Sequence, residues 1–205
     1  MLKNEYEKRQ KKIRELSIPF LEKKLREKEE QIAKYSSDGK NRKELISVFD
    51  VLFQKGIEAQ KNEEKEKVAY IVIHFFRSSI MTKSFECEIT LYDDQFYYDT
   101  KEISQIWSPD WIIPFYEKDI EDLEHYLKKN ILRLHSGELA EVEMYYGGDY
   151  FQYLIEMFQD VVLEVTELNS YKELQKEDNC KILLGEIYQN YLILFDASME
   201  ESESV

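Results

Sequence analysis

Apolar residues are sparse and helically spaced through the first part of the chain, and this pattern predicts two helices. Residues 4–35 are dominated by Lys, Glu, Arg and Gln, which favour helices, and carry only a thin apolar series. Pro19 lies inside this segment and predicts either a kink or a restart with Ser17 as the new N-cap. A wider apolar stripe follows. Asn41, with Glu44 three residues later, predicts the start of the second helix.

From residue 68 the pattern changes to one typical of strands. Residues 68–77 are almost continuously apolar, β-branched or aromatic, as in a strand buried on both faces. Residues 85–91 alternate apolar and polar side chains, which predicts a half-buried strand. Asp93 and Asp94 then predict a turn, and residues 96–98 predict the returning strand. We therefore expect an antiparallel meander.

The second half of the chain predicts further helices and a closing hairpin. Pro109 and Pro114 make a regular strand unfavourable over residues 106–115, because proline has no backbone N–H. Helices are expected at residues 117–130, 136–146 and 149–168, with Gly147 and Gly148 separating the last two and Asp149 as a cap. Residues 182–184 and 191–195 flank a turn at residues 188–190, as in a hairpin.

These elements predict an α+β fold, in which an N-terminal helical hairpin is followed by an antiparallel sheet with helices packed on one face. Residues 61–67 contain no apolar side chain, so we place a boundary there. The predicted organisation is an N-terminal helical segment at residues 1–66, an α+β body at 67–198 and a disordered acidic tail at 199–205.

Charge is the most informative property of the composition. The 205 residues carry a formal net charge of -14, which opposes binding to a nucleic-acid backbone. Residues 1–67 hold 18 basic and 14 acidic residues, a net of +4, and residues 68–205 hold 10 basic and 28 acidic residues, a net of -18. The acidic body favours a basic protein partner, and residues 1–60 could serve self-association.

The chain shows no sign of secretion or of a membrane span. Its charged start lacks an apolar leader region, and no stretch approaches the ~20 apolar residues that a span needs. Cys87 and Cys180 are the only cysteines and lie in no metal-binding spacing, so we expect both to be reduced. A cytoplasmic protein without a cofactor is the resulting prediction.

Few residues are suited to catalysis. His74 shares a strand face with apolar residues and is expected to be a buried, hydrogen-bonded core histidine. Glu121 and His125 lie four residues apart on a predicted helix and offer a weak metal pair. Glycine-rich phosphate loops and the common hydrolase motifs are absent from the sequence. Carboxylates around the first hairpin could pair for acid/base or Mg²⁺ chemistry: Glu86, Glu88, Asp93, Asp94 and Asp99.

Two aromatic groups beside acidic residues are the best candidates for contact with a partner. Tryptophan in a rigid loop is the residue type that most often anchors a partner, and tyrosine beside carboxylates suits arginine. The alternative for each group is packing in the core. The candidate partner-binding residues are Trp107, Asp110 and Trp111 in the proline-rich loop, and Tyr145, Tyr146, Asp149 and Tyr150 near the two glycines.

The sequence thus favours a non-enzymatic, acidic protein-binding module, with an immunity or antitoxin-like inhibitor of a basic effector protein as one concrete form. One alternative is an enzyme without a recognisable motif that depends on a metal or on paired carboxylates. A second alternative is a scaffold that oligomerises through its N-terminal helices.

Overall fold

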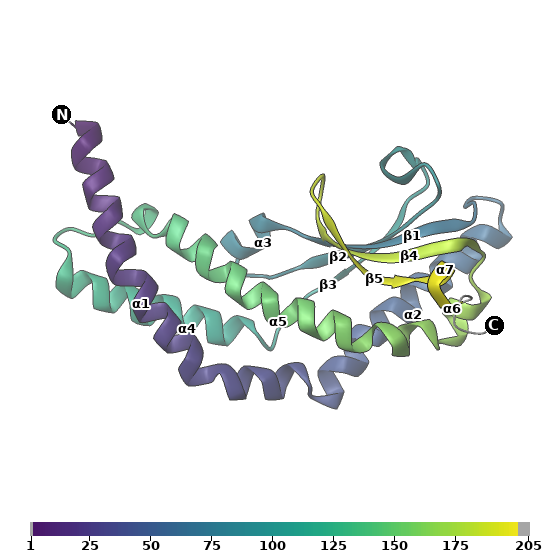
Figure 1. Ribbon diagram of the computed structural model, residues 1–205, viewed down its shortest axis with the longest axis horizontal. Coiled ribbons are helices and arrows are strands. Elements are labelled where there is room, and N and C mark those ends of the chain that lie inside the picture. Colours follow the sequence, from purple (N-terminus) through teal and green to yellow (C-terminus); the bar gives the residue numbers. More distant parts are fainter. Residues whose placement is uncertain (1, 201–205) are drawn as a thin grey trace.

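The computed structural model describes residues 2–200, and Figure 1 shows helices at one end and along one side of a single sheet. The α-helices are α1 (Leu2–Ser36), α2 (Gly39–Lys61), α3 (Arg77–Met81), α4 (Ile113–Asn130), α5 (Ala140–Thr166), α6 (Asn169–Glu173) and α7 (Ala197–Glu200). The strands are β1 (Val68–Phe75), β2 (Cys87–Tyr92), β3 (Ile103–Trp107), β4 (Lys176–Glu186) and β5 (Tyr191–Asp196), with 3-10 turns η1 (Phe96–Tyr98) and η2 (Ser136–Glu138).

The sheet is five-stranded in the order β3-β2-β1-β4-β5, and the predicted α+β class is confirmed. Neighbouring strands are antiparallel except for β1 and β4, which are parallel, so the sheet is mixed rather than purely antiparallel. The reason lies in the connection. The chain leaves β3, passes through α4 and α5, and returns beside β1, and a helical crossover of this length allows parallel pairing.

The helices α2 and α5 pack against one face of the sheet, as predicted. Figure 1 shows α5 running on beyond the sheet, where it packs with α1 and α4 into a helical bundle. One hydrophobic core passes through both regions, because Ile13 of α1, Leu52 of α2, Ile73 of β1 and Phe158 of α5 belong to the same buried cluster. The boundary drawn at residue 66 remains a prediction, although the core continues across it.

The first two helices differ in detail from the prediction. α1 continues through Pro19, and Ser17 is not an N-cap, because its hydroxyl donates to the Ile13 carbonyl one turn back at 2.8 Å within the helix. Figure 1 shows that α1 bends along its length, in keeping with the expected kink. α2 begins at Gly39 with Asp38 as its N-cap residue, and the Asn41 amide donates to the Tyr35 carbonyl near the end of α1 instead of capping α2. α2 then runs on beneath the sheet rather than back along α1.

The predicted strands at residues 68–77 and 85–91 are confirmed as β1 and β2, but the returning strand lies later than expected. Residues 96–98 form η1 instead, because Phe96 has a positive φ of 54° and the chain turns tightly there. The strand that pairs with β2 is β3, so Ile106 and Trp107 join the ladder and the irregular loop begins only at Ser108.

The predicted break at Gly147 and Gly148 is wrong, since both glycines lie inside the continuous helix α5. Gly147 is required by packing: a Cβ there would lie 2.3 Å from Cγ2 of Ile80 on α3. The hairpin expected at residues 182–195 is confirmed by β4 and β5. Of the tail predicted at residues 199–205, residues 201–205 lie outside the described residues, while residues 199 and 200 belong to α7 rather than to a disordered segment.

Candidate protein-binding surface

The charges of the N-terminal segment are largely neutralised within the molecule. Basic side chains of α1 and of the start of α2 form ion pairs with acidic side chains from the chain segment that holds α4 and α5. The excess positive charge of residues 1–67 therefore faces the bundle itself rather than a separate partner. The pairs are Arg9–Glu138, Arg14–Glu141, Lys24–Asp122, Lys28–Asp119 and Arg42–Glu164.

The most buried of these acids is Asp119, whose carboxylate is fully enclosed between α1, α4 and α5. The hydroxyls of Tyr146 and Tyr150 donate to its Oδ2 at 2.7 and 2.8 Å, and Lys28 donates to Oδ1. Burial, together with the neighbouring carboxylate, raises the pKa of both phenols well above its ordinary value. These two tyrosines therefore stabilise the bundle, and their side chains are removed from the surface that a partner would contact.

The other predicted partner-binding residues are divided between core and surface. Trp107 is buried against Phe158, and Trp111 is half-buried beside Tyr35. Asp149 is half-buried. Asp110 and Tyr145 are exposed, the latter at 61%. Contact with a partner stays a prediction for all seven residues, and only these last two present most of their side chains to solvent.

The face of the sheet opposite α2 and α5 bears a second set of aromatic residues, and we call it the loop face. It is defined by Val72, His74, Tyr92, Leu183 and Tyr191, which project from β1, β2, β4 and β5 on that side. Val72, Tyr92 and Leu183 form a small apolar cluster distinct from the main core. The loop that contains η1 and the tip of the β4–β5 hairpin rise on this side of the sheet (Figure 1).

His74 lies at the centre of this face and is 1% exposed. Its Nε2 lies 3.3 Å from the Tyr92 hydroxyl and its Nδ1 lies 3.4 Å from the Tyr191 hydroxyl. Burial lowers the pKa of His74 to about 4, so the imidazole is neutral at physiological pH. The prediction of a buried, hydrogen-bonded histidine is confirmed.

A loop at residues 93–101 covers one side of the loop face and is fixed by a buried ion pair. The Asp99 carboxylate accepts from the backbone N–H of Asp93 at 2.9 Å, from that of Lys101 at 2.7 Å, and from the ammonium of Lys65. Lys65 and Asp99 are both almost fully buried. Lys65 belongs to the charged run at residues 61–67, so part of that run anchors the loop.

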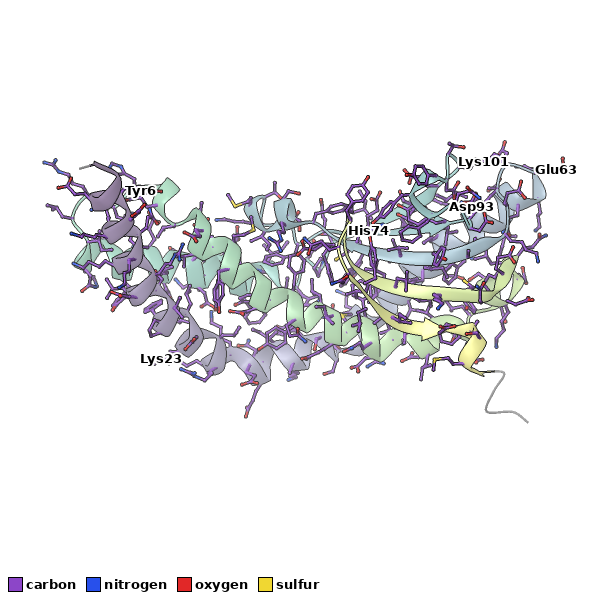
Figure 2. The ribbon with its side chains drawn as sticks, turned by 45° about the horizontal axis from the view of Figure 1, so that its top comes forward. Tyr6, Lys23, Glu63, His74, Asp93 and Lys101 are labelled. Carbon is purple, nitrogen blue, oxygen red and sulfur yellow. The ribbon has the colours of Figure 1, made fainter. Side chains whose placement is uncertain are left out.

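Beside this loop lies an acidic hollow of about 760 Å³, between the end of α2, the start of β4 and the start of the loop. Figure 2 shows Glu63 and Asp93 at this end of the sheet. The acidic side chains of the hollow form no ion pair within residues 2–200, whereas five acids of the segment that holds α4 and α5 do. Those of the hollow are Glu63, Glu66, Asp93, Asp94 and Glu177, and the other charged residues that line the hollow are Lys65, committed to Asp99, and Lys67.

Exposed tyrosines lie at the tips of the loop and of the hairpin on the loop-face side of the sheet. Tyr98 is 86% and Tyr188 82% exposed. The rings of Tyr97 and Tyr188 lie 4.7 Å apart between centroids, which joins the loop to the hairpin across the loop face. Tyrosine rings and free carboxylates together suit the guanidinium groups of a basic partner.

Sequence reasoning missed this surface for a local reason. The pattern favours a strand at residues 96–98 and a simple turn at residues 188–190, which gives no reason to consider their tyrosines together. The signal is present in the sequence as three consecutive aromatic residues directly after Asp93, Asp94 and Gln95. Their proximity to Tyr188 depends on the parallel pairing of β1 with β4, which no local pattern predicts.

The helical pair considered for a metal, Glu121 and His125 of α4, lies apart from this surface. His125 directs Nδ1 to the backbone carbonyl of Glu121 at 3.0 Å, while the Glu121 carboxylate pairs with Lys118. Within the described residues, no group of three or more His, Cys, Asp or Glu side chains is placed to hold a metal ion. No helix in that part of the chain is long and apolar enough to cross a membrane.

Comparison with protein-family models, with curated proteins and with solved structures gives no match to this chain.

Proposed function

We propose that this protein is a non-enzymatic, acidic protein-binding module that binds a basic protein partner through the acidic hollow and the exposed tyrosines, Tyr98 and Tyr188, of the loop and hairpin that cover the loop face. The observation that carries the proposal is the contrast in charge pairing. Five acids of the segment that holds α4 and α5 are paired with basic residues of α1 and α2, whereas the five acids of the hollow form no ion pair among the described residues. Uncompensated charge in a hollow attracts and orients a partner of opposite charge.

An immunity or antitoxin-like inhibitor that covers a basic effector is one concrete form of this function. The support for it is physical: an acidic surface accelerates association with a basic partner, and exposed tyrosines supply contact area at low entropic cost. Tyr98 and Tyr188 are the residues we expect to form the apolar centre of the contact, with the acids of the hollow at its rim.

The alternatives from the sequence stay predictions with less support. Oligomerisation through α1 would have to use its polar surface, because Ile13, Leu21 and Ile32 are buried within the same chain. A carboxylate-dependent enzyme would need two acids of the hollow to converge on a substrate, and the exposed hollow provides little exclusion of water.

The proposal is tested by neutralising the hollow. The tagged protein and a variant with four substitutions (Glu66→Gln, Asp93→Asn, Asp94→Asn and Glu177→Gln) are used to capture partners from the host at low and at about physiological salt. The matched control removes the same charge from exposed glutamates of α1, α4 and α5 that form no ion pair among the described residues: Glu29→Gln, Glu30→Gln, Glu117→Gln and Glu156→Gln.

We expect the wild type and the control to retain the same stoichiometric basic protein, and the hollow variant to bind it at least about tenfold more weakly. The affinity of the purified complex should fall as salt is raised. Equal affinity of the hollow variant and the control variant for the partner would show that the hollow does not bind it. A bound partner without basic character, or binding that is insensitive to salt, would contradict the electrostatic proposal itself.

A further inference from the structure

The sheet has two edge strands, β3 and β5. β3 forms one edge and packs against α2, whose Lys55 reaches the Gln105 side chain at 2.7 Å. β5 forms the other edge, and within residues 2–200 its backbone from Tyr191 to Phe195 hydrogen-bonds only to β4. An edge strand directs alternate N–H and C=O groups outward, and these groups can pair with a further strand.

The side chains of β5 do not block such pairing. Leu192 and Ile193 are 43% and 54% exposed, and no charged residue or proline lies between Tyr191 and Phe195. Proteins usually protect exposed edges with lysine, proline or inward-pointing charges. The first charged residue of the strand, Asp196, lies at its end and is paired with Lys181.

The edge is continuous with the candidate binding surface, because Tyr191 begins β5 and lies beside His74 on the loop face. A second copy of the chain is disfavoured as occupant, since each copy carries a net charge of -14. A basic segment is favoured by the same charge. The free backbone groups further require that this segment be extended, because a helix satisfies its own backbone hydrogen bonds.

We propose that the basic partner adds an extended segment to β5 as a sixth strand of the sheet, with basic side chains alternating with apolar ones. This inference rests on the proposed function and adds the mode of binding to it. Apolar side chains of the added strand contact Ile193 on the loop-face side of the sheet, and its basic side chains, which point to the opposite side, lie in the negative field of the body.

The test uses two synthetic peptides of about eight residues in which Lys and Val alternate. In one peptide every second amide is N-methylated, which removes its backbone donors on one edge but leaves its charge unchanged. Binding is measured by fluorescence anisotropy, and amide hydrogen exchange is followed in the full-length protein. We expect the unmodified peptide to bind at least about tenfold more tightly than the methylated one, and to slow exchange of the β5 amides.

A pair of lysine variants locates the site. Ile193→Lys places positive charge on the edge and should weaken the unmodified peptide about tenfold, whereas Leu163→Lys adds the same charge to an exposed apolar position of α5 and should leave binding unchanged. If Ile193→Lys folds poorly, slower exchange of the β5 amides of the wild type in the presence of the unmodified peptide locates the site independently.

The outcomes separate the mode of binding from the function. Equal, salt-sensitive binding of both peptides without protection of β5 overturns strand addition and leaves the acidic binding function standing. Absence of binding by both peptides also overturns strand addition, while the capture experiment still decides the function. Protection of β5 that rises with protein concentration alone would identify a second copy as the occupant and overturn the proposal.

Discussion

Replacing Lys65 by Met tests whether the buried ion pair holds the loop at residues 93–101 in place. In the folded protein the Lys65 ammonium contacts the Asp99 carboxylate and donates to the Leu91 carbonyl at 3.1 Å, with both charged side chains almost fully buried. Methionine has a similar length but no charge. The Lys65→Met variant therefore leaves a buried carboxylate without its counter-ion.

The expected cost follows from the bonds that remain. Removing one partner of a buried ion pair typically costs about 3–5 kcal/mol, because the other charge stays buried. Asp99 keeps two hydrogen bonds, from the backbone N–H groups of Asp93 and Lys101, which offset part of this cost. We expect the free energy of unfolding to fall by about 3 kcal/mol, equivalent to a decrease in Tm of roughly 6–12 °C for a chain of this size.

The assay is urea denaturation of four proteins: the wild type, Lys65→Met, Asp99→Asn and the double variant. The double variant buries no charge, although the asparagine oxygen can accept from only one of the two backbone donors, which bind different oxygens of Asp99. Its loss should still be smaller than the sum of the single losses by about 2 kcal/mol. The same comparison by hydrogen exchange should show faster exchange of the loop amides in Lys65→Met than in the double variant.

The pH dependence of stability provides an independent check that the ion pair stabilises the folded protein. Burial alone would raise the pKa of Asp99, but hydrogen bonds from Lys65 and from the backbone outweigh it and hold that pKa below its ordinary value. The ion pair therefore stabilises the wild type fully above about pH 4 and less as pH falls through the lowered pKa. Without Lys65 the pKa of Asp99 rises, so the deficit of Lys65→Met should shrink below about pH 5. A deficit under about 0.5 kcal/mol at pH 7 would refute the reasoning.

Three further outcomes are expected. Gly147→Ala should destabilise by about 1–3 kcal/mol, because its Cβ would collide with Ile80, whereas Gly148→Ala, where a Cβ meets nothing within 4 Å, should stabilise by about 0.5–1 kcal/mol; thermal denaturation distinguishes them. Lowering the pH from 6.5 to 4 should reduce the stability of the wild type by up to about 3 kcal/mol, because His74 binds a proton more readily in the unfolded state than in the folded state. His74→Gln should flatten this pH dependence, measured by urea denaturation at each pH. Tyr146→Phe should cost about 1–2 kcal/mol in urea denaturation through the lost hydrogen bond to the Asp119 carboxylate.

The elements with a strong local pattern are predictable from the sequence. The continuous apolar run of β1 and the paired apolar runs of β4 and β5 have the composition that strands require, and the pattern predicts both at nearly the observed positions. The long charged helix α1 is predictable for the same reason. In each case the local preference and the tertiary environment agree.

The errors arise where tertiary contacts override a local preference. Gly147 and Gly148 are typical of a break, but α3 packs so closely against α5 that Gly147 is needed inside a helix. Residues 96–98 have the side chains of a strand, but the hydrogen bonds to Asp99 turn the chain there. The sequence could not show that Asp99 pairs with Lys65, which lies 34 positions away.

The charge asymmetry between the halves of the sequence becomes a different asymmetry in space. The basic residues of α1 are far in sequence from the acids of α4 and α5 yet pair with them, so the charge of that half is largely cancelled where the helices meet. The acids that line the hollow at the far end of the sheet, such as Asp94 and Glu177, have no ion pair among residues 2–200. Because only uncancelled charge produces a field outside the protein, the sheet half is the end at which a basic partner should first make contact. The exposed tyrosines and the free edge of β5 lie on that same half of the molecule. The tyrosine rings can therefore contact the partner, and the backbone of β5 can pair with it, at the end towards which the field attracts it.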